Sequence, residues 1–145
     1  MRFTRLLSSI LILLFVSILL SLSCKKDKTE RVPSVPVNIS IPPNSVQFNS
    51  LNTIGGWVYV TGGYKGIIVY RKDSETFMSF DRACPFHPTE ECSRLKVEAS
   101  GLIAVDSCCG SRFFLTDGSV LKGPSTLPLK SYYTTFDGNY IYITN

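Results

Sequence analysis

From residue 45 onward the chain is a succession of short apolar runs, each cut off by a turn. The runs are rich in β-branched and aromatic residues, which favour strands, and they occupy residues 57–61, 66–72, 76–81, 102–105, 112–116, 132–136 and 140–144. Asp-Gly pairs at 117–118 and 137–138 predict hairpins with type I′ turns. No segment after residue 45 has a sustained helical period. The pattern predicts an all-β domain over residues 44–145, a small β-sandwich or barrel.

The first 23 residues have the parts of an export signal. Arg2 and Arg5 precede an apolar run over residues 6–22, and small residues stand just before Cys24. This arrangement resembles the lipobox of bacterial lipoproteins, in which the cysteine thiol takes up diacylglycerol, although Ser21 stands where that motif usually has leucine. Plain secretion and an uncleaved membrane anchor are the alternatives. The anchor is disfavoured because the lysines just beyond the run would oppose its orientation.

Residues 24–43 are expected to form a lipidated, proline-rich tether, because they hold four prolines and show no apolar period. The domain would then be lipid-anchored in the cell envelope, facing the periplasm or the surface. Removing Arg2 and Arg5 with the signal lowers the formal net charge from +4 to +2. A charge this balanced gives no electrostatic footprint for nucleic acid.

Two stretches between the predicted strands collect cysteine and histidine. The first reads DRACPFHPTEECSRL and contains Cys84, His87 and Cys92. The second reads AVDSCCGSRFF and contains Cys108 and Cys109. Cysteine and histidine gathered in two separated loops are typical of a metal site or of a disulfide framework.

These stretches resemble the loops of the Rieske iron–sulfur domain, which carry C-x-H and then C-x-x-H-G-S. Here the loops read Cys-Pro-Phe-His at 84–87 and Asp-Ser-Cys-Cys-Gly-Ser-Arg-Phe at 106–113. The family's glycine- and proline-rich turn corresponds to GPSTLPL at 123–129. The resemblance covers roughly residues 55–145. It implies a Rieske-like β domain with two cysteine-bearing loops and one-electron transfer to a redox protein partner.

The ligands of the family are only partly matched. Its centre holds one iron by two cysteines and the other by two histidines, whereas this chain has one histidine. The resemblance places Cys84 at a cysteine position, Phe86 and Cys109 at the histidine positions and Asp106 at the second cysteine position. His87 lies one place late. The middle cysteine, Cys108, matches one that forms a disulfide in some family members, with Cys92 as the implied partner.

Three interpretations of these residues stay open. A variant [2Fe–2S] site would use Cys84, His87 and Cys109, with Asp106 or Cys108 as the fourth ligand. A cluster-free domain would be stapled by disulfides, and the resemblance favours Cys92–Cys108, which leaves Cys84–Cys109. A structural zinc would take three cysteines and His87, although the usual C-x₂₋₄-C pairs are absent.

The compartment bears on this choice, because thiols outside the cytoplasm tend to oxidise. Arg2 and Arg5 are not adjacent, so the signal lacks the paired arginines of folded-protein export. Two functions follow: a tethered electron carrier, or a binding or structural module that has kept the fold and lost the cluster. Neither is an enzyme, since no nucleophile–base pair is visible in the sequence. Arg82 and Arg112 flank the loops, either to steer an anionic partner or in surface ion pairs.

Overall fold

The computed structural model describes residues 31–145 and is nearly all β. The expected signal peptide and Cys24 lie outside the described residues. Ten strands and one short 3₁₀ helix follow in the order β1 (Asn38–Ile41), η1 (Val46–Asn52), β2 (Trp57–Val60), β3 (Ile67–Arg71), β4 (Phe77–Asp81), β5 (Lys96–Val97), β6 (Ile103–Val105), β7 (Arg112–Phe114), β8 (Val120–Lys122), β9 (Tyr133–Phe136) and β10 (Ile141–Thr144). Each of the seven predicted runs contains a strand, which confirms the all-β prediction.

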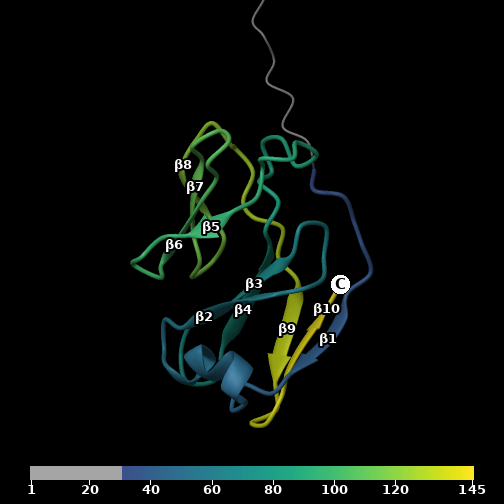
Figure 1. Ribbon diagram of the computed structural model, residues 1–145, viewed down its shortest axis with the longest axis vertical. Helices are drawn as coiled ribbons and strands as arrows, with labels where there is room; N and C mark the ends of the chain where they lie inside the picture. Colours follow the sequence, from purple (N-terminus) through teal and green to yellow (C-terminus); the bar gives the residue numbers. More distant parts are fainter. Residues whose placement is uncertain (1–30) are drawn as a thin grey trace, which may run out of the picture.

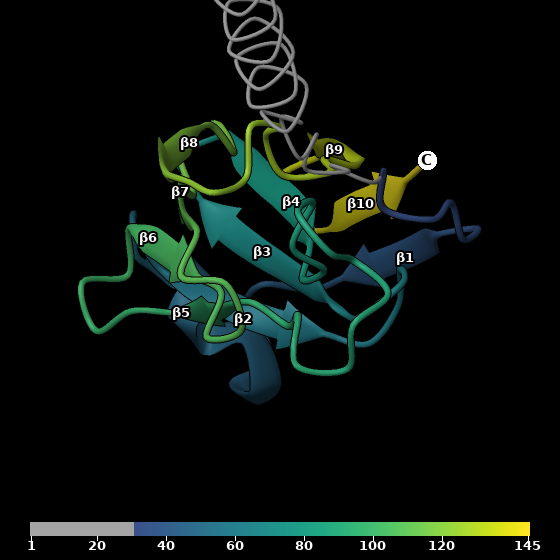
Figure 2. The ribbon, with the colours of Figure 1, turned by 90° about the horizontal axis from the view of Figure 1, so that it is seen from above.

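The strands form three antiparallel sheets, in the orders β1-β10-β9, β2-β3-β4 and β5-β6-β7-β8. Seen from above, the β2-β3-β4 sheet lies between the other two (Figure 2). The first and second sheets join where β4 meets the start of β9, through a bridge between Phe80 and Ser131. The third sheet is built entirely from the chain between β4 and β9, and Figure 1 shows it set to one side of the other strands.

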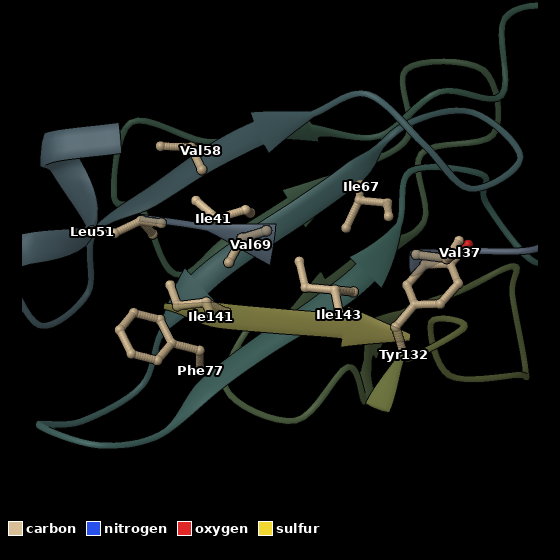
Figure 3. Packing of buried hydrophobic residues seen from close by; sticks show 10 residues of the cluster. All are labelled: Val37, Ile41, Leu51, Val58, Ile67, Val69, Phe77, Tyr132, Ile141 and Ile143. Atoms are coloured by element: carbon tan, nitrogen blue, oxygen red, sulfur yellow. The ribbon is translucent and has the colours of Figure 1, made fainter. Parts of the chain in front are cut away.

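Strand β3 separates two apolar cores. Its residues Ile67 to Tyr70 are all buried, so both faces of the strand are covered. Because side chains alternate along a strand, Ile67 and Val69 enter the first core while Ile68 and Tyr70 enter the second. Figure 3 shows the first core, in which the side chains of Ile67 and Val69 face residues of β1, β10 and η1. The second core holds the buried face of the cysteine-bearing insert.

The structure moves the start of the domain into the segment expected to be a tether. Residues 38–41 form β1, which pairs with β10 from Asn38 opposite Thr144 to Ile41 opposite Ile141. This segment forms a strand because Ile39 and Ile41 pack in the first core despite the neighbouring prolines. The Asn145 side chain holds the segment just before β1 in place, because its Oδ1 accepts from Val37 N at 3.0 Å and its Nδ2 donates to Val35 O at 2.7 Å.

The two Asp-Gly pairs do end in hairpins, β7–β8 and β9–β10, but the turns are not type I′. That type needs positive φ at both central residues, and among residues 31–145 only glycines have positive φ. Asp137 instead accepts from Asn139 N and Tyr140 N through its Oδ1, at 2.8 and 2.7 Å. These aspartates therefore form side-chain-supported turns, with Gly118 and Gly138 supplying the positive φ.

Candidate metal site

The four cysteines of the domain sit in two loops of the insert. One loop joins β4 to β5 and carries Cys84 and Cys92, and the other joins β6 to β7 and carries Cys108 and Cys109. A disulfide joins Cys92 to Cys108, with Cα atoms 5.4 Å apart, and ties the two loops together. This is the pairing that the family resemblance implies. Cys84 and Cys109 are free thiols.

Cys84, Asp106 and Cys109 bring three possible ligand atoms together, and we call this group the three-donor site. The two Sγ atoms and one carboxylate oxygen all lie within 4.8 Å of one another. Cys84 and Asp106 are buried, while Cys109 is partly exposed. The Sγ atoms of Cys84 and Cys109 are 3.7 Å apart. The site therefore has an enclosed side and an edge that reaches the surface.

The second loop is shaped by its own aspartate. The Asp106 backbone donates to Ser111 O at 2.9 Å and accepts from Gly110 N at 2.8 Å, which closes the turn. Its Oδ1 accepts from Cys108 N at 2.9 Å. These bonds leave Oδ2 toward Cys109, whose Sγ lies 3.1 Å away. The same side chain therefore folds the loop and contributes an oxygen to the site.

Two serine hydroxyls complete the surroundings. Ser111 Oγ lies 3.1 Å from Cys109 Sγ and accepts from Ser125 N at 2.9 Å, which links the site to the GPSTLPL turn. Ser93 Oγ reaches Asp106 Oδ2 at 3.5 Å. Neither serine was predicted as a site residue. Ser111 lies in the Gly-Ser-Arg-Phe stretch of the second loop, which the family resemblance covers, whereas no local pattern singles out Ser93.

Burial controls the protonation of Cys84. Its side chain is fully enclosed in the second core, and this desolvation, followed by contact with the Asp106 carboxyl, raises the pKa of the thiol far above its ordinary value. Without a cation beside it, Cys84 is therefore a neutral thiol. A bound metal would reverse this preference, because coordination favours the thiolate.

The Rieske cluster does not fit these residues. Of the four family ligand positions, the three-donor site fills those of Cys84, Asp106 and Cys109, but the fourth is Phe86, which packs against the second core. His87 is exposed, its ring centroid lies 4.2 Å from that of Phe86, and it is not part of the three-donor site. Cys108 is already bonded to Cys92. Among residues 31–145, four donors for two irons do not converge here.

A single metal ion fits better. Two thiolates bound tetrahedrally at about 2.3 Å, as around zinc, lie about 3.8 Å from each other. The observed separation of 3.7 Å is close to this value before any ion enters. With the Asp106 oxygen as a third ligand, one coordination position is left for water or another ligand.

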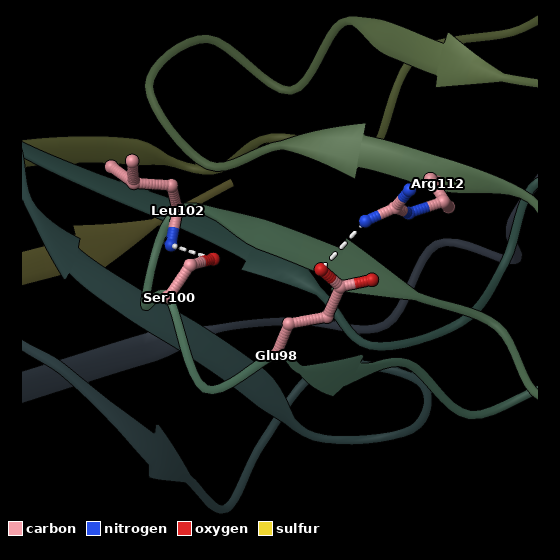
Figure 4. Close-up of polar contacts among 4 residues, drawn as sticks. All are labelled: Glu98, Ser100, Leu102 and Arg112. Carbon is pink, nitrogen blue, oxygen red and sulfur yellow. Dashed lines mark hydrogen bonds and ion pairs between the residues drawn. The ribbon is translucent and has the colours of Figure 1, made fainter.

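Of the two roles considered for Arg112, steering an anionic partner or forming a surface ion pair, the structure shows the ion pair. Arg112 Nη2 forms an ion pair with Glu98 Oε2 at 2.7 Å, which links β7 to the first residue of the turn between β5 and β6 (Figure 4). Ser100 Oγ, in the same turn, accepts from Leu102 N at 3.4 Å. Arg112 is thus a surface ion-pair residue, and its charge is already compensated.

Two apolar cores on opposite sides of β3, an insert between β4 and β9 and two loops joined by a disulfide match the Rieske-type domain that the sequence motifs imply. A structure comparison agrees: the plasma membrane Rieske protein of the cyanobacterium Synechocystis superposes with a TM-score of 0.55 at 21% identity, over 74% of this chain and 99% of that one. The ferredoxin of carbazole 1,9a-dioxygenase from Nocardioides aromaticivorans matches with a TM-score of 0.48 at 17% identity, over 77% and 98%. The Sphingomonas yanoikuyae ferredoxin matches at 0.44 and 19%, over 61% and 84%.

The domain is therefore Rieske-like in fold, as the sequence motifs predicted. No protein-family model and no curated protein matches the chain. Within residues 31–145 there is no helix with the length and apolar character that crossing a bilayer requires.

Proposed function

We propose that this protein is a membrane-tethered electron carrier of Rieske-like fold that binds one iron ion at the three-donor site. The observation that carries the proposal is the convergence of three donor atoms within 4.8 Å. Thiolate ligands suit iron, and the partly exposed Cys109 gives a redox partner access to the site. When bound, the iron would supply one-electron chemistry.

Each residue has a defined part in this proposal. Cys84 and Cys109 provide sulfur ligands and Asp106 an oxygen ligand. The Ser111 hydroxyl, 3.1 Å from Cys109 Sγ, orients that sulfur and adjusts its electron density. The domain would catalyse no reaction of its own, and the partner of the domain would be a redox protein.

The tether belongs to the same proposal. Lipid on Cys24 would hold the domain in the cell envelope, on the periplasmic or surface side of a bacterial membrane. Cys24→Ser is expected to move the protein from the membrane fraction to the soluble fraction, and mass spectrometry of the N-terminal peptide measures the lipid directly. An unmodified Cys24 in a membrane-bound protein would refute the lipid anchor.

Iron analysis of the full chain, purified anaerobically in detergent and loaded with Fe(II), tests the site. We expect one iron per protein and no acid-labile sulfide. Asp106→Asn and Cys109→Ser should lose the iron. Asp117→Asn is the matched control, because Asp117 Oδ1 accepts from Ser119 N just as Asp106 Oδ1 accepts from Cys108 N. Labile sulfide would indicate a variant cluster instead, and iron that survives both site substitutions would refute the site.

A second candidate function rests on the contact between Cys84 and Cys109. Their sulfurs are 3.7 Å apart in loops that already hold one disulfide, so a second bridge would give a cluster-free binding or structural module. Thiol counting under denaturing conditions separates the two proposals. The electron carrier retains two free thiols after iron removal under argon, whereas the stapled module has none in the part of the chain described by the structure.

A further inference from the structure

A groove beside strand β2 gathers positive charge away from the three-donor site. It has a volume of about 740 Å³ and lies between β2, the turn at residues 61–66 and the loop that joins β4 to β5. Its charged lining residues are Lys65, Arg82, Arg94 and Glu91. We call this the basic groove. Three cations face one carboxylate, so the groove carries a positive excess.

That excess is not neutralised within the protein. Among residues 31–145 the one salt bridge joins Arg112 to Glu98, so no carboxylate oxygen lies within 4.0 Å of a side-chain nitrogen of Lys65, Arg82 or Arg94. Each cation is instead bound by uncharged acceptors. Arg82 Nε donates to Leu95 O at 3.1 Å, and Arg94 Nε donates to Lys65 O at 2.9 Å. Lys65 Nζ donates to Glu90 O.

The two arginines are held close together. A Cβ built on Gly66 would lie 3.2 Å from Arg82 Cδ and 3.4 Å from Arg94 Nη2, so both side chains flank this glycine. Arg82 also lies over the Tyr59 ring, 3.6 Å from its centroid, which fixes the plane of its guanidinium. Partial burial, together with the positive charge of Arg94, lowers the pKa of Arg82, while Tyr59 acts in the opposite sense.

Fixed and uncompensated guanidinium groups are the arrangement that carboxylates and phosphates recognise. Arginine forks pair bidentately with both groups, and little side-chain entropy is lost when the forks are already positioned. The volume of this open groove lies within the range of about 300–1,000 Å³ typical of ligand pockets, so it has room for a small molecule.

We propose that the basic groove binds a small anionic ligand through a carboxylate or phosphate group held between Arg82 and Arg94. This site is separate from the proposed iron site, since none of its lining residues is Cys84, Asp106 or Cys109. Thr89 and Glu91 place one wall of the groove on the loop that holds Cys92.

Calorimetry on the full chain in detergent at low ionic strength tests the groove, with inorganic phosphate and citrate as separate probes. We expect at least one probe to bind with a Kd of about 1 mM or tighter, and the preferred probe identifies the anion. Arg94→Gln should weaken that binding about tenfold or more, and Lys65→Gln by a smaller factor. Arg31→Gln removes an equal charge at an exposed position outside the groove and should leave the Kd unchanged.

Two results would overturn the proposal. One is that neither anion binds the wild-type protein. The other is that Arg94→Gln and Arg31→Gln weaken binding equally, which would show attraction by net charge alone. If Arg94→Gln fails to fold, Lys65→Gln decides the same question, because the Lys65 side chain contributes charge without supporting Arg94. Loss of iron binding leaves the groove unaffected, so the two proposals fail separately.

Discussion

A buried carboxylate joins two sheets of this fold, and removing one of its partners gives a measurable prediction. Asp81, fully buried at the end of β4, accepts from Tyr132 Oη at 2.6 Å through Oδ2. The same carboxylate accepts from Tyr64 N at 2.6 Å, Lys65 N at 3.2 Å and Ala83 N at 2.8 Å. It therefore fixes both the turn before β3 and the start of the cysteine-bearing loop.

Tyr132→Phe removes one of four hydrogen bonds and leaves the carboxylate with three backbone donors. A hydrogen bond to a charged group contributes roughly 1.5–3 kcal/mol, and we expect a loss of about 2 kcal/mol because Asp81 is not orphaned. For a domain of this size the loss corresponds to a Tm about 8 °C lower. Asp81→Asn should cost more, since an amide NH₂ would replace one acceptor oxygen opposite backbone donors.

Urea unfolding followed by the fluorescence of Trp57, the single tryptophan, measures the free energy of unfolding. Tyr133→Phe is the matched control, because Tyr133 is adjacent and 71% exposed, and it should change stability by less than about 0.5 kcal/mol. Equal losses in the two variants would refute the role given to the Tyr132–Asp81 bond.

The same bond has a pH dependence. Burial, and then the hydrogen bond to Asp81, raise the pKa of Tyr132 well above its ordinary value of about 10. Below about pH 10 both states keep the proton and the contribution is complete. Above it the unfolded chain loses the phenol proton first, so stability falls as the pH rises. Tyr132→Phe should flatten this alkaline decline, and a parallel decline in both proteins would contradict the assignment.

Two further predictions concern the loops and turns. Replacing both Cys92 and Cys108 with serine should lower the free energy of unfolding by about 3 kcal/mol, because the bridge closes a loop with a sequence separation of 16. Urea unfolding measures this loss, and an unchanged midpoint would show that the disulfide is dispensable. Gly118→Ala should cost about 2 kcal/mol more than Gly138→Ala, because both glycines have positive φ but only a Cβ at 118 meets Phe80, at 2.7 Å from Cε1. Equal losses in thermal unfolding would remove Phe80 from the explanation.

Local sequence patterns predicted the strands that carry most of the core, because alternation and β-branched side chains are local properties. They missed β1, which stands among prolines, and the short strands β5 and β8, which contain two and three residues. Strand β1 exists because β10, distant in sequence, pairs with it, whereas β5 and β8 pair with their hairpin neighbours β6 and β7 and are too short to show an alternating pattern. The Tyr132–Asp81 bond, 51 residues apart along the chain, leaves no local trace either.

The site was predictable in part, through the family resemblance. Matching the family positions one by one identified Cys84, Asp106 and Cys109 as candidate ligands, and the structure places these three residues together. His87 was included for its chemistry, yet the adjacent aromatic ring of Phe86 is drawn into the second core, and the histidine is left in solvent. Which of two neighbouring residues faces inward depends on packing that spacing alone does not contain.

The pairing of β1 with β10 also imposes an order of assembly. Val37 and Asn145, which bond to each other, are separated by 108 positions, so the sheet containing β1 cannot close until β10 is available. The two loops of the cysteine-bearing insert close over a much shorter separation, since their disulfide spans 16 positions. Contacts close in sequence form before distant ones, because closing a longer loop costs more entropy. A chain emerging from its N-terminal end would thus complete its cysteine-bearing loops first, while the segment nearest the proposed anchor would pair last.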